Sequence, residues 1–231
     1  LNIGSVREGE RIMFAGLPWE VQRINFFCNL INPVADISLR IPISHFIGLE
    51  SRPVKANEPW FPCKRGDWVI LTDGVRGKVI GISQEMVQLL GRGGAQVTYQ
   101  MSDFLANSPR NLDTNFRIKE IIGISYSLQK TITTTIPETL QSYIQERIEL
   151  EGYGEQLLNL RVEFAQAGNS SLDVAIIADF RGELGDLYNR LRRAIQRWSV
   201  DACTEYGWEI PFPQMTLHGS IATVKSSVDE N

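Results

Sequence analysis

The chain has 231 residues, enough for one large domain or for two to three small ones with their own cores. A hydrophobic content of 43% excludes a largely disordered chain, and the net charge of −4 argues against a nucleic-acid binder, which normally carries a basic face. No run approaches the roughly 18 apolar residues of a membrane span, and no signal peptide is recognisable. Because the sequence begins with Leu1 rather than Met, we expect it to be a fragment of a longer protein.

Two stretches in the first half of the chain resemble each other. Residues 7–14 (REGERIMF) match residues 64–71 (KRGDWVIL), and Ser44-His45-Phe46 matches Ser102-Asp103-Phe104 in nearly the same register. This spacing predicts two tandem copies of one small β unit, in residues 1–53 and 64–113. The alternative is that any two β-rich segments that open on a Gly-acid turn look alike. Residues 54–63 are rich in proline and are predicted to be a linker.

The strand pattern is clearest in the second copy. Short apolar segments alternate there with turns such as Thr72-Asp73-Gly74 and Arg92-Gly93-Gly94. Such short strands predict a small, strongly twisted sheet or open barrel of the Sm-like type. The four predicted strands are Asp67–Leu71, Gly77–Ser83, Glu85–Leu90 and Ala95–Met101.

After residue 113 the pattern changes to longer elements. Residues 117–126 (RIKEIIGISY) predict a strand. A helix is predicted to follow, with Thr135 as its N-cap, Pro137 in the first turn and Glu138 returning the capping hydrogen bond. Apolar residues then recur every four positions at Leu140, Ile144 and Ile148, which predicts one buried face.

The remaining elements complete a βαββαβ order. Alternating apolar residues on either side of Gly168-Asn169 predict a hairpin with one buried face: Leu158, Leu160, Val162 and Phe164, then Leu172, Val174, Ile176, Ala178 and Phe180. A long helix is predicted from Leu184, with Leu187, Leu191, Ile195, Trp198 and Ala202 on one face. Gly207 suits the left-handed position after its last turn. Met215, Leu217 and Ile221 predict a final strand.

These elements predict an α+β protein. Its N-terminal part would be two Sm-like units in tandem, and residues 114–224 would form a ferredoxin-like βαββαβ domain. Residues 225–231 would be a C-terminal tail.

No catalytic or metal-binding constellation is recognisable in the sequence. Cys28, Cys63 and Cys203 are odd in number and form no CxxC pair, so we expect buried, inert thiols in a reducing compartment. The two histidines, His45 and His218, lie 173 positions apart without ligand or triad spacing, and a structural or merely exposed role is predicted for both. We therefore expect no catalytic, cofactor-binding or metal-binding residues.

Two further motifs have an ordinary structural interpretation. Gly91-Arg92-Gly93-Gly94 lacks the Lys-Ser/Thr pair of a phosphate loop and is predicted to be a hairpin turn. Four arginines form the one basic cluster, which predicts a solvated or intersubunit face, with an anion site as the alternative: Arg190, Arg192, Arg193 and Arg197. Asp179, Glu183 and Asp186 lie near the predicted start of the same helix, where the helix dipole favours acids.

Several segments resemble, in continuous order over residues 64–218, the small-conductance mechanosensitive channel (MscS) family. The most specific is IPFPQ at residues 210–214, before the predicted last strand. The others are GDWV with GVRGKV in 66–79, SPRNL at 108–112, EIIGISY at 120–126 and GNSSL at 168–172. The family's Ile-Pro-Asn-Ser-like step is missing from the second copy, which has YQMS at 99–102. The first copy has Ile41-Pro42-Ile43-Ser44, which is nearer to the pattern.

The resemblance implies the cytoplasmic region of an inner-membrane channel without its pore-lining helices. In that family a homo-oligomeric ring, usually a heptamer, forms a cage beneath a tension-gated pore that relieves hypo-osmotic stress. Ions and small solutes enter the cage through lateral portals. The partners implied are further copies of the chain, the membrane and the permeating solutes, with no cofactor, no catalysis and no nucleic acid.

Two other functions stay open at this point. The predicted Sm-like and ferredoxin-like folds would also suit an RNA- or ligand-binding module, although the charge of −5 over residues 114–231 disfavours RNA. An enzyme that uses Cys and His is the third interpretation, and nothing local in the sequence supports it.

Overall fold

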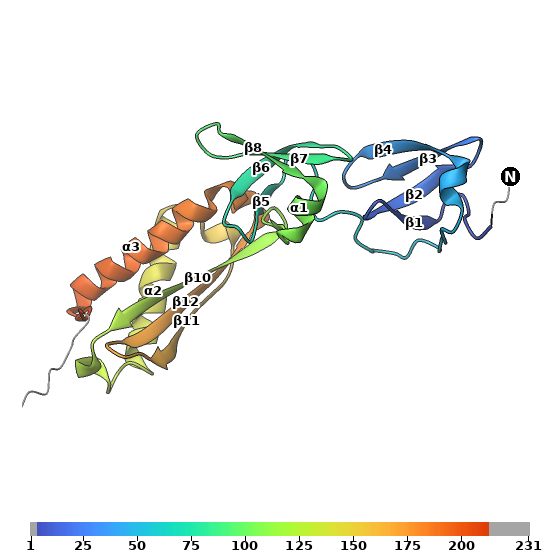
Figure 1. The fold of residues 1–231 in the computed structure, drawn as a ribbon. Coiled ribbons are helices and arrows are strands. Elements are labelled where there is room, and N and C mark those ends of the chain that lie inside the picture. Colours follow the sequence, from blue (N-terminus) through green and yellow to red (C-terminus); the bar gives the residue numbers. More distant parts are fainter. Residues whose placement is uncertain (1–3, 213–231) are drawn as a thin grey trace, which may run out of the picture.

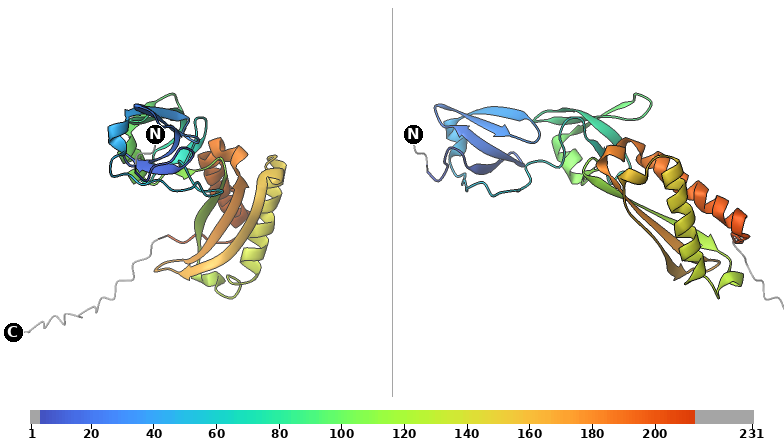
Figure 2. Two further views of the ribbon diagram at one scale, coloured as in Figure 1. Left: turned by 90° about the vertical axis from the view of Figure 1, so that its right-hand side faces the viewer. Right: turned by 180° about the vertical axis from the view of Figure 1, so that it is seen from behind.

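The computed structural model describes residues 4–212, which form three sheets that follow one another along an elongated molecule (Figure 1). A four-stranded N-terminal sheet lies at one end, a five-stranded middle sheet comes next, and a three-stranded sheet with two long helices lies at the other end (Figure 2). None of the helices described is both long and apolar enough to cross a membrane.

The N-terminal sheet is an antiparallel meander in the order β1-β2-β3-β4. Its strands alternate buried and exposed positions, so that Trp19 and Leu30 face the core at 1% exposure each. A short 3-10 helix follows and places Phe46 over the same core. The elements are β1 (Arg11–Phe14), β2 (Leu17–Arg23), β3 (Phe27–Asn32), β4 (Ile37–Pro42) and η1 (Ile43–Phe46).

The middle sheet has the strand order β8-β7-β6-β5-β9. Its first four strands fall within a residue or two of the prediction, except that Met101 begins a helix instead of ending the last strand. The short helix α1 and the two-residue strand β9 were not predicted. The elements are β5 (Trp68–Ile70), β6 (Arg76–Ile82), β7 (Met86–Leu90), β8 (Gln96–Gln100), α1 (Met101–Ala106) and β9 (Arg110–Asn111).

The two β-rich stretches share their local architecture. Each has four antiparallel strands followed by a short helix that buries a phenylalanine. The opening turn is also the same. The amide of Gly9 donates to the Val21 carbonyl at 2.8 Å, and the amide of Gly66 donates to the Val79 carbonyl at 2.8 Å. Both glycines have positive φ angles, 77° and 103°, which explains why glycine stands at both positions.

The Pro-rich segment predicted as a linker packs closely on the N-terminal sheet. The buried side chain of Asn32 donates to the Trp60 carbonyl at 2.9 Å, and Phe61 is only 7% exposed. The guanidinium of Arg11 lies over the Trp60 ring and pairs with Glu58 at 3.1 Å. The core residues of both β sheets belong to one continuous hydrophobic cluster. The segment therefore holds the two sheets together as well as connecting them.

The remaining residues form an α/β layer. Strand β12 lies between β10 and β11 and is antiparallel to both, so that β10 and β11 run parallel to each other. Helices α2 and α3 cover one face of this sheet (Figures 1 and 2). The elements are β10 (Asn115–Ile124), η2 (Tyr126–Leu128), α2 (Thr135–Leu150), η3 (Gly154–Gln156), β11 (Leu157–Ala167), β12 (Leu172–Arg181), η4 (Gly182–Leu187) and α3 (Tyr188–Tyr206).

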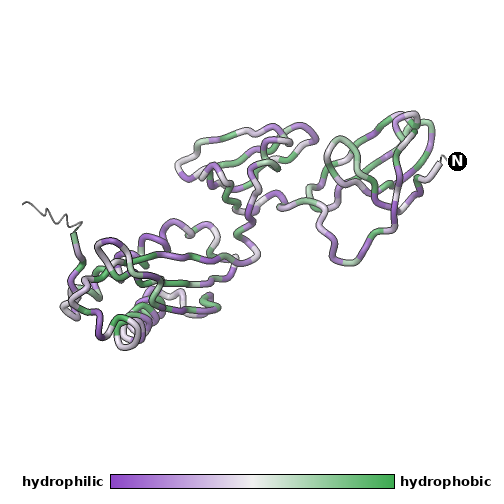
Figure 3. The backbone as a smooth tube through the Cα atoms, turned by 60° about the horizontal axis from the view of Figure 1, so that its bottom comes forward, coloured by the Kyte–Doolittle hydropathy of each residue, from purple (hydrophilic) through white to green (hydrophobic). Residues whose placement is uncertain are grey.

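The predicted apolar faces form the core of the α/β layer. Leu140, Ile144 and Ile148 are fully buried, and so are the predicted residues of α3 from Leu191 to Ala202. Figure 3 colours the backbone by hydropathy and shows green, hydrophobic segments along the strands. Gly207 ends α3 at φ 68°, as predicted.

Three details differ from the prediction. The long helix α3 begins at Tyr188 and not at Leu184, because residues 182–187 form the 3-10 helix η4. Thr135 is the first residue of α2 rather than its N-cap, and Thr134, which precedes it, makes no capping hydrogen bond with its side chain. The capping box is therefore wrong. Leu158 is 46% exposed because a register shift between Leu157 and Asn159 turns it away from the core.

The last predicted strand, with Met215, Leu217 and Ile221, lies outside the described residues, so the complete ferredoxin-like order stays a prediction. The described part of the IPFPQ segment leaves α3 beside the end of β10, where the Ser125 amide donates to the Glu209 carbonyl at 2.9 Å.

Candidate functional site at the interdomain junction

The residues considered for catalysis stay apart in the structure. Cys28, Cys63 and Cys203 are buried free thiols, as expected. Burial and the nearby charge of Asp67 raise the pKa of Cys63 to about 12. His45 is exposed and stacks on Phe14, with ring centroids 6.0 Å apart. His218 lies outside the described residues. Within residues 4–212, no group of three His, Cys, Asp or Glu side chains could hold a metal ion.

Of the three acidic residues predicted at the start of α3, Asp179 and Asp186 form ion pairs, and Glu183 lies in the first turn of η4. Asp179 lies within β12 and pairs across the sheet with Arg117 of β10 at 2.7 Å. This pair lowers the pKa of Asp179. Asp186 lies in η4 and pairs with Arg92 at 3.1 Å. The prediction of helix capping was therefore wrong for Asp179, which lies within β12, the strand predicted to run to Phe180, and not at the start of a helix.

Arg92 is the exposed tip of the Gly-rich turn, which is a hairpin turn between β7 and β8 as predicted. The hairpin overhangs the start of α3 (Figures 1 and 2). One guanidinium nitrogen of Arg92 donates both to the Asp186 carbonyl at 2.5 Å and to the Asp186 carboxylate at 3.1 Å. The turn therefore has a role that its sequence did not reveal: it attaches the middle sheet to the α/β layer.

Arg76 of β6 forms the second part of this junction. Its Nη1 atom donates to the carbonyls of Gly185 and Asp186, both at 3.2 Å. Its guanidinium lies over the Trp68 ring, 4.8 Å from the ring centroid. Desolvation lowers the pKa of Arg76, and the positive charge of Arg92 lowers it further. Its Nε atom is the one buried side-chain N or O atom within residues 4–212 that has no hydrogen-bond partner.

The third part of the junction is a close approach of two backbone segments. A Cβ atom at Gly182 would lie 1.7 Å from the Asp113 carbonyl oxygen, and one at Gly185 would lie 2.9 Å from the Asp113 carboxylate. The other carboxylate oxygen of Asp113 accepts a hydrogen bond from the Trp68 amide at 3.2 Å. Only glycine fits at residue 182. The middle sheet and the α/β layer are therefore in direct backbone contact.

A cavity of about 380 Å³ lies beside the junction, between β10 and α3. Its lining includes Glu120, which is only 8% exposed and accepts hydrogen bonds from Arg192 at 2.5 Å and from Gln196 at 2.7 Å. Arg193 and Asn189 complete the lining. Of the predicted arginine cluster, Arg192 and Arg193 thus reach the cavity, whereas Arg197 pairs with Glu151 on α2 at 2.5 Å.

The signals for this junction in the sequence are weak. Gly182 and Gly185 follow a strand at a spacing of three, which is unusual at a predicted helix start. Arg76 and Asp113 carried no local signal at all, because their partners lie far away in the sequence.

The same architecture occurs in a solved channel structure. A crystal structure of Helicobacter pylori MscS in the closed state matches with a TM-score of 0.52 and 20% sequence identity, over 70% of this chain and 60% of that chain. The chain has the fold of part of an MscS channel. At this identity the match concerns the fold alone.

The other comparisons add little. Two cryo-EM structures of Arabidopsis thaliana MSL1 match 66% of the chain, with TM-scores of 0.43 and 0.46 at 17% and 14% identity, and cover 54% and 52% of the MSL1 chains. No protein-family model matches the sequence, and no curated protein matches it. The chain spans only about 60% of the length of the bacterial MscS structure.

Proposed function

We propose that this chain is part of the cytoplasmic cage of an MscS-like mechanosensitive channel. The observation that carries the proposal is the fold match to H. pylori MscS over 70% of the chain. The resemblance of residues 64–218 in sequence supports it independently, because the matching segments occur in the same order as in the family. In this proposal the chain lies on the cytoplasmic side of an inner membrane and filters ions and small solutes that pass to a tension-gated pore.

The free strand edges favour assembly into a ring. Strand β8 is the outer strand of the middle sheet and has the sequence QVTYQ, without charge or proline. Its residue Val97 is 37% exposed. An uncharged edge of this kind invites pairing with another chain, and cyclic symmetry covers such edges without fibre growth. We propose a homo-oligomeric ring, with seven subunits as in the family.

The N-terminal sheet would lengthen the wall of this cage. It repeats the element order of the middle sheet and shares a hydrophobic cluster with it. Both would be Sm-like units, in residues 1–53 and 64–113, joined by the packed segment 54–63. The α/β layer would be the ferredoxin-like domain of residues 114–224.

The decisive experiment uses the complete gene that encodes this chain. A bacterial strain without mechanosensitive channels is transformed with it, and survival after hypo-osmotic shock is counted. Pressure-clamp recordings from membrane patches then test for tension-gated currents. We expect both rescue and currents. A full-length protein that reaches the membrane but gives neither result would refute the proposal.

The oligomeric state is tested separately on residues 1–231. Light scattering gives the mass of this fragment in solution, and a ring predicts a multiple of 26.1 kDa. A monomer would refute self-assembly of the fragment but would leave the channel assignment to the electrophysiology.

A further inference from the structure

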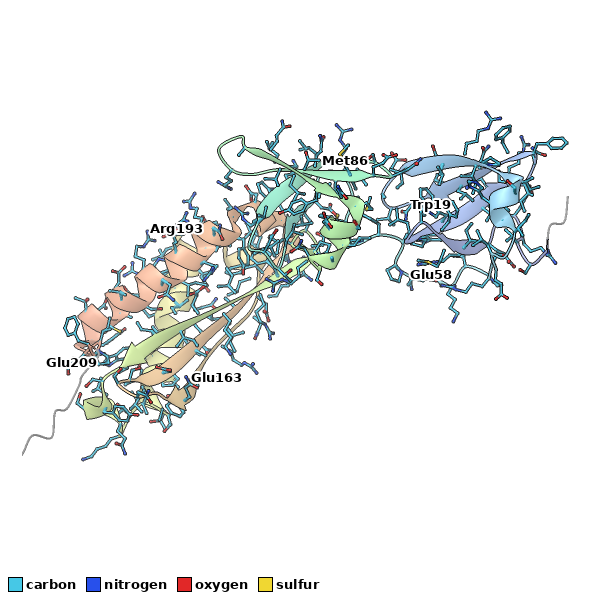
Figure 4. All side chains as sticks on the ribbon, viewed as in Figure 1. Trp19, Glu58, Met86, Glu163, Arg193 and Glu209 are labelled. Carbon is cyan, nitrogen blue, oxygen red and sulfur yellow. The ribbon has the colours of Figure 1, made fainter. Side chains whose placement is uncertain are left out.

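The cavity between β10 and α3 carries positive charge in a protein whose net charge is −4. Arg192 and Arg193 of α3 line it, and Arg76 and Arg92 of the middle sheet bind the neighbouring backbone of Gly185 and Asp186. Desolvation lowers the pKa of Arg76, and the positive charges of Arg92 and Arg193 lower it further, so the charge of Arg193 also acts on the junction. Figure 4 shows Arg193 on the half of α3 that is nearer to the middle sheet.

The one carboxylate of the cavity lining does not balance this charge. Glu120 is engaged by Arg192 and Gln196. Two guanidinium groups therefore face one carboxylate, which leaves a net charge of +1 in the lining.

Two donor groups in the cavity are unused. The guanidinium of Arg193 and the side-chain amide of Asn189 have no hydrogen bond or ion pair with any residue from 4 to 212. Arg192 uses its Nε atom for Glu120, which leaves its terminal nitrogens without a protein partner in the same range. These groups line one side of the 380 Å³ cavity, so that a ligand there could be contacted by several donors at once.

We propose that this cavity binds a small oxyanion, such as inorganic phosphate, held by Arg193, Asn189 and the free nitrogens of Arg192. Planar guanidinium groups match the oxygen geometry of phosphate and carboxylate groups, and a halide offers no such paired acceptors. The anion would relieve the repulsion among the arginines at the junction. It would thereby strengthen the attachment of the α/β layer to the middle sheet. This inference does not depend on the channel assignment.

The experiment is a titration of the whole chain with sodium phosphate, followed by NMR and calorimetry at constant ionic strength, with chloride as the replacement salt. We expect saturable binding, with shift changes centred on Asn189, Arg192 and Arg193. Sulfate should compete with phosphate, whereas chloride should not.

Two variants with the same loss of charge test the location of the site. Arg193→Gln removes the unpaired guanidinium from the cavity, and we expect it to weaken phosphate binding about tenfold or more. Arg190→Gln is the control, because Arg190 is exposed on the same helix but does not line the cavity. It should weaken binding by less than about twofold, as expected for a screened surface charge.

Three results would overturn the proposal. The first is phosphate binding that does not saturate, and the second is equal weakening by both variants, which would indicate diffuse attraction to the helix. The third is a set of shift changes that map away from the cavity. Far-UV circular dichroism of each variant checks that the fold is retained, because Arg193 and Arg190 are both exposed and neither substitution should disturb the core.

Discussion

The backbone contact at Gly182 leads to the sharpest prediction about this protein. Gly182→Ala would place a Cβ atom 1.7 Å from the Asp113 carbonyl oxygen and 2.1 Å from its carbonyl carbon. Ordinary contact begins at 3.4 Å, so the two segments must separate by about 1.7 Å. No rotamer change can relieve this clash, because both partners belong to the main chain.

The cost can be worked out from what such a separation breaks. Overpacking alone typically costs about 1–3 kcal/mol. A shift of residues 182–186 also weakens the hydrogen bonds from Arg76 to the Gly185 and Asp186 carbonyls, where a bond to a charged group contributes about 1.5–3 kcal/mol. We therefore expect Gly182→Ala to destabilise the junction by about 3 kcal/mol or more. The core around α2 and β12 should remain folded, because the three atoms nearest to the new Cβ are backbone atoms of Asp113 and not core side chains.

Urea unfolding measures this effect, with tryptophan fluorescence and far-UV circular dichroism as two probes. Trp68 lies under the Arg76 guanidinium at the junction, so the fluorescence of the variant should change at a lower urea concentration than its circular dichroism. Gly91→Ala is the matched control, since its Cβ would meet only the Ala95 carbonyl oxygen at 3.5 Å. It should cost less than about 0.5 kcal/mol. If Gly182→Ala unfolds like the control, the close approach at Asp113 is wrong.

Three further predictions concern the rest of the molecule. The hydrogen bond from Arg52 holds the pKa of Glu58 at about 2, below its ordinary 4.5. Glu58 therefore stabilises the fold fully above a pH of about 4.5, and this contribution is lost as the pH falls through about 2. Melting temperatures measured across this pH range should show the loss in the wild type, but not in Glu58→Gln. Leu160→Ala should lower the free energy of unfolding by about 2–5 kcal/mol, and Leu158→Ala should lower it by less than about 0.5 kcal/mol. Urea unfolding measures both values, and equal effects would contradict the bulge in β11. Iodoacetamide at neutral pH should leave the three buried thiols of the native protein largely unmodified, as detected by mass spectrometry. The pKa of Cys63 is raised to about 12, and rapid labelling of this residue would contradict its burial.

Local patterns predicted most of the elements because they depend on neighbouring residues. Alternating apolar positions located β12, and the four-residue steps located the buried face of α2. The repeated Gly-acid turn located the start of each β-rich stretch, because a positive φ angle requires glycine there. The predictions of the helix cap and of a buried Leu158 were wrong because the local rule behind each allows more than one outcome. Thr134 and Thr135 are chemically equal candidates for a cap, and a bulge shifted Leu158 away from the alternating pattern.

The contacts of the candidate site could not be predicted from local patterns. The sequence singled out the arginines of α3 and the Gly-rich turn, but it could not say that Arg92 in that turn reaches Asp186, 94 positions away. Nor could it pair Arg76 with Gly185, which lies 109 positions further on. Such contacts depend on how two separately folded layers dock, and that docking leaves no periodic trace in either segment.

The sequence by itself therefore determined most elements of the middle sheet and the α/β layer, the apolar faces of α2 and α3, and the resemblance to a channel family. These follow from burial and turn chemistry, which act over a few residues. Only the tertiary structure decided that the Pro-rich segment is packed rather than free, that Gly182 touches Asp113, and that Arg76 and Arg92 of the middle sheet both bind Asp186. The physical reason is that hydrophobic burial is specified by residue type and spacing, whereas hydrogen bonds and backbone contacts between layers require a defined position in space.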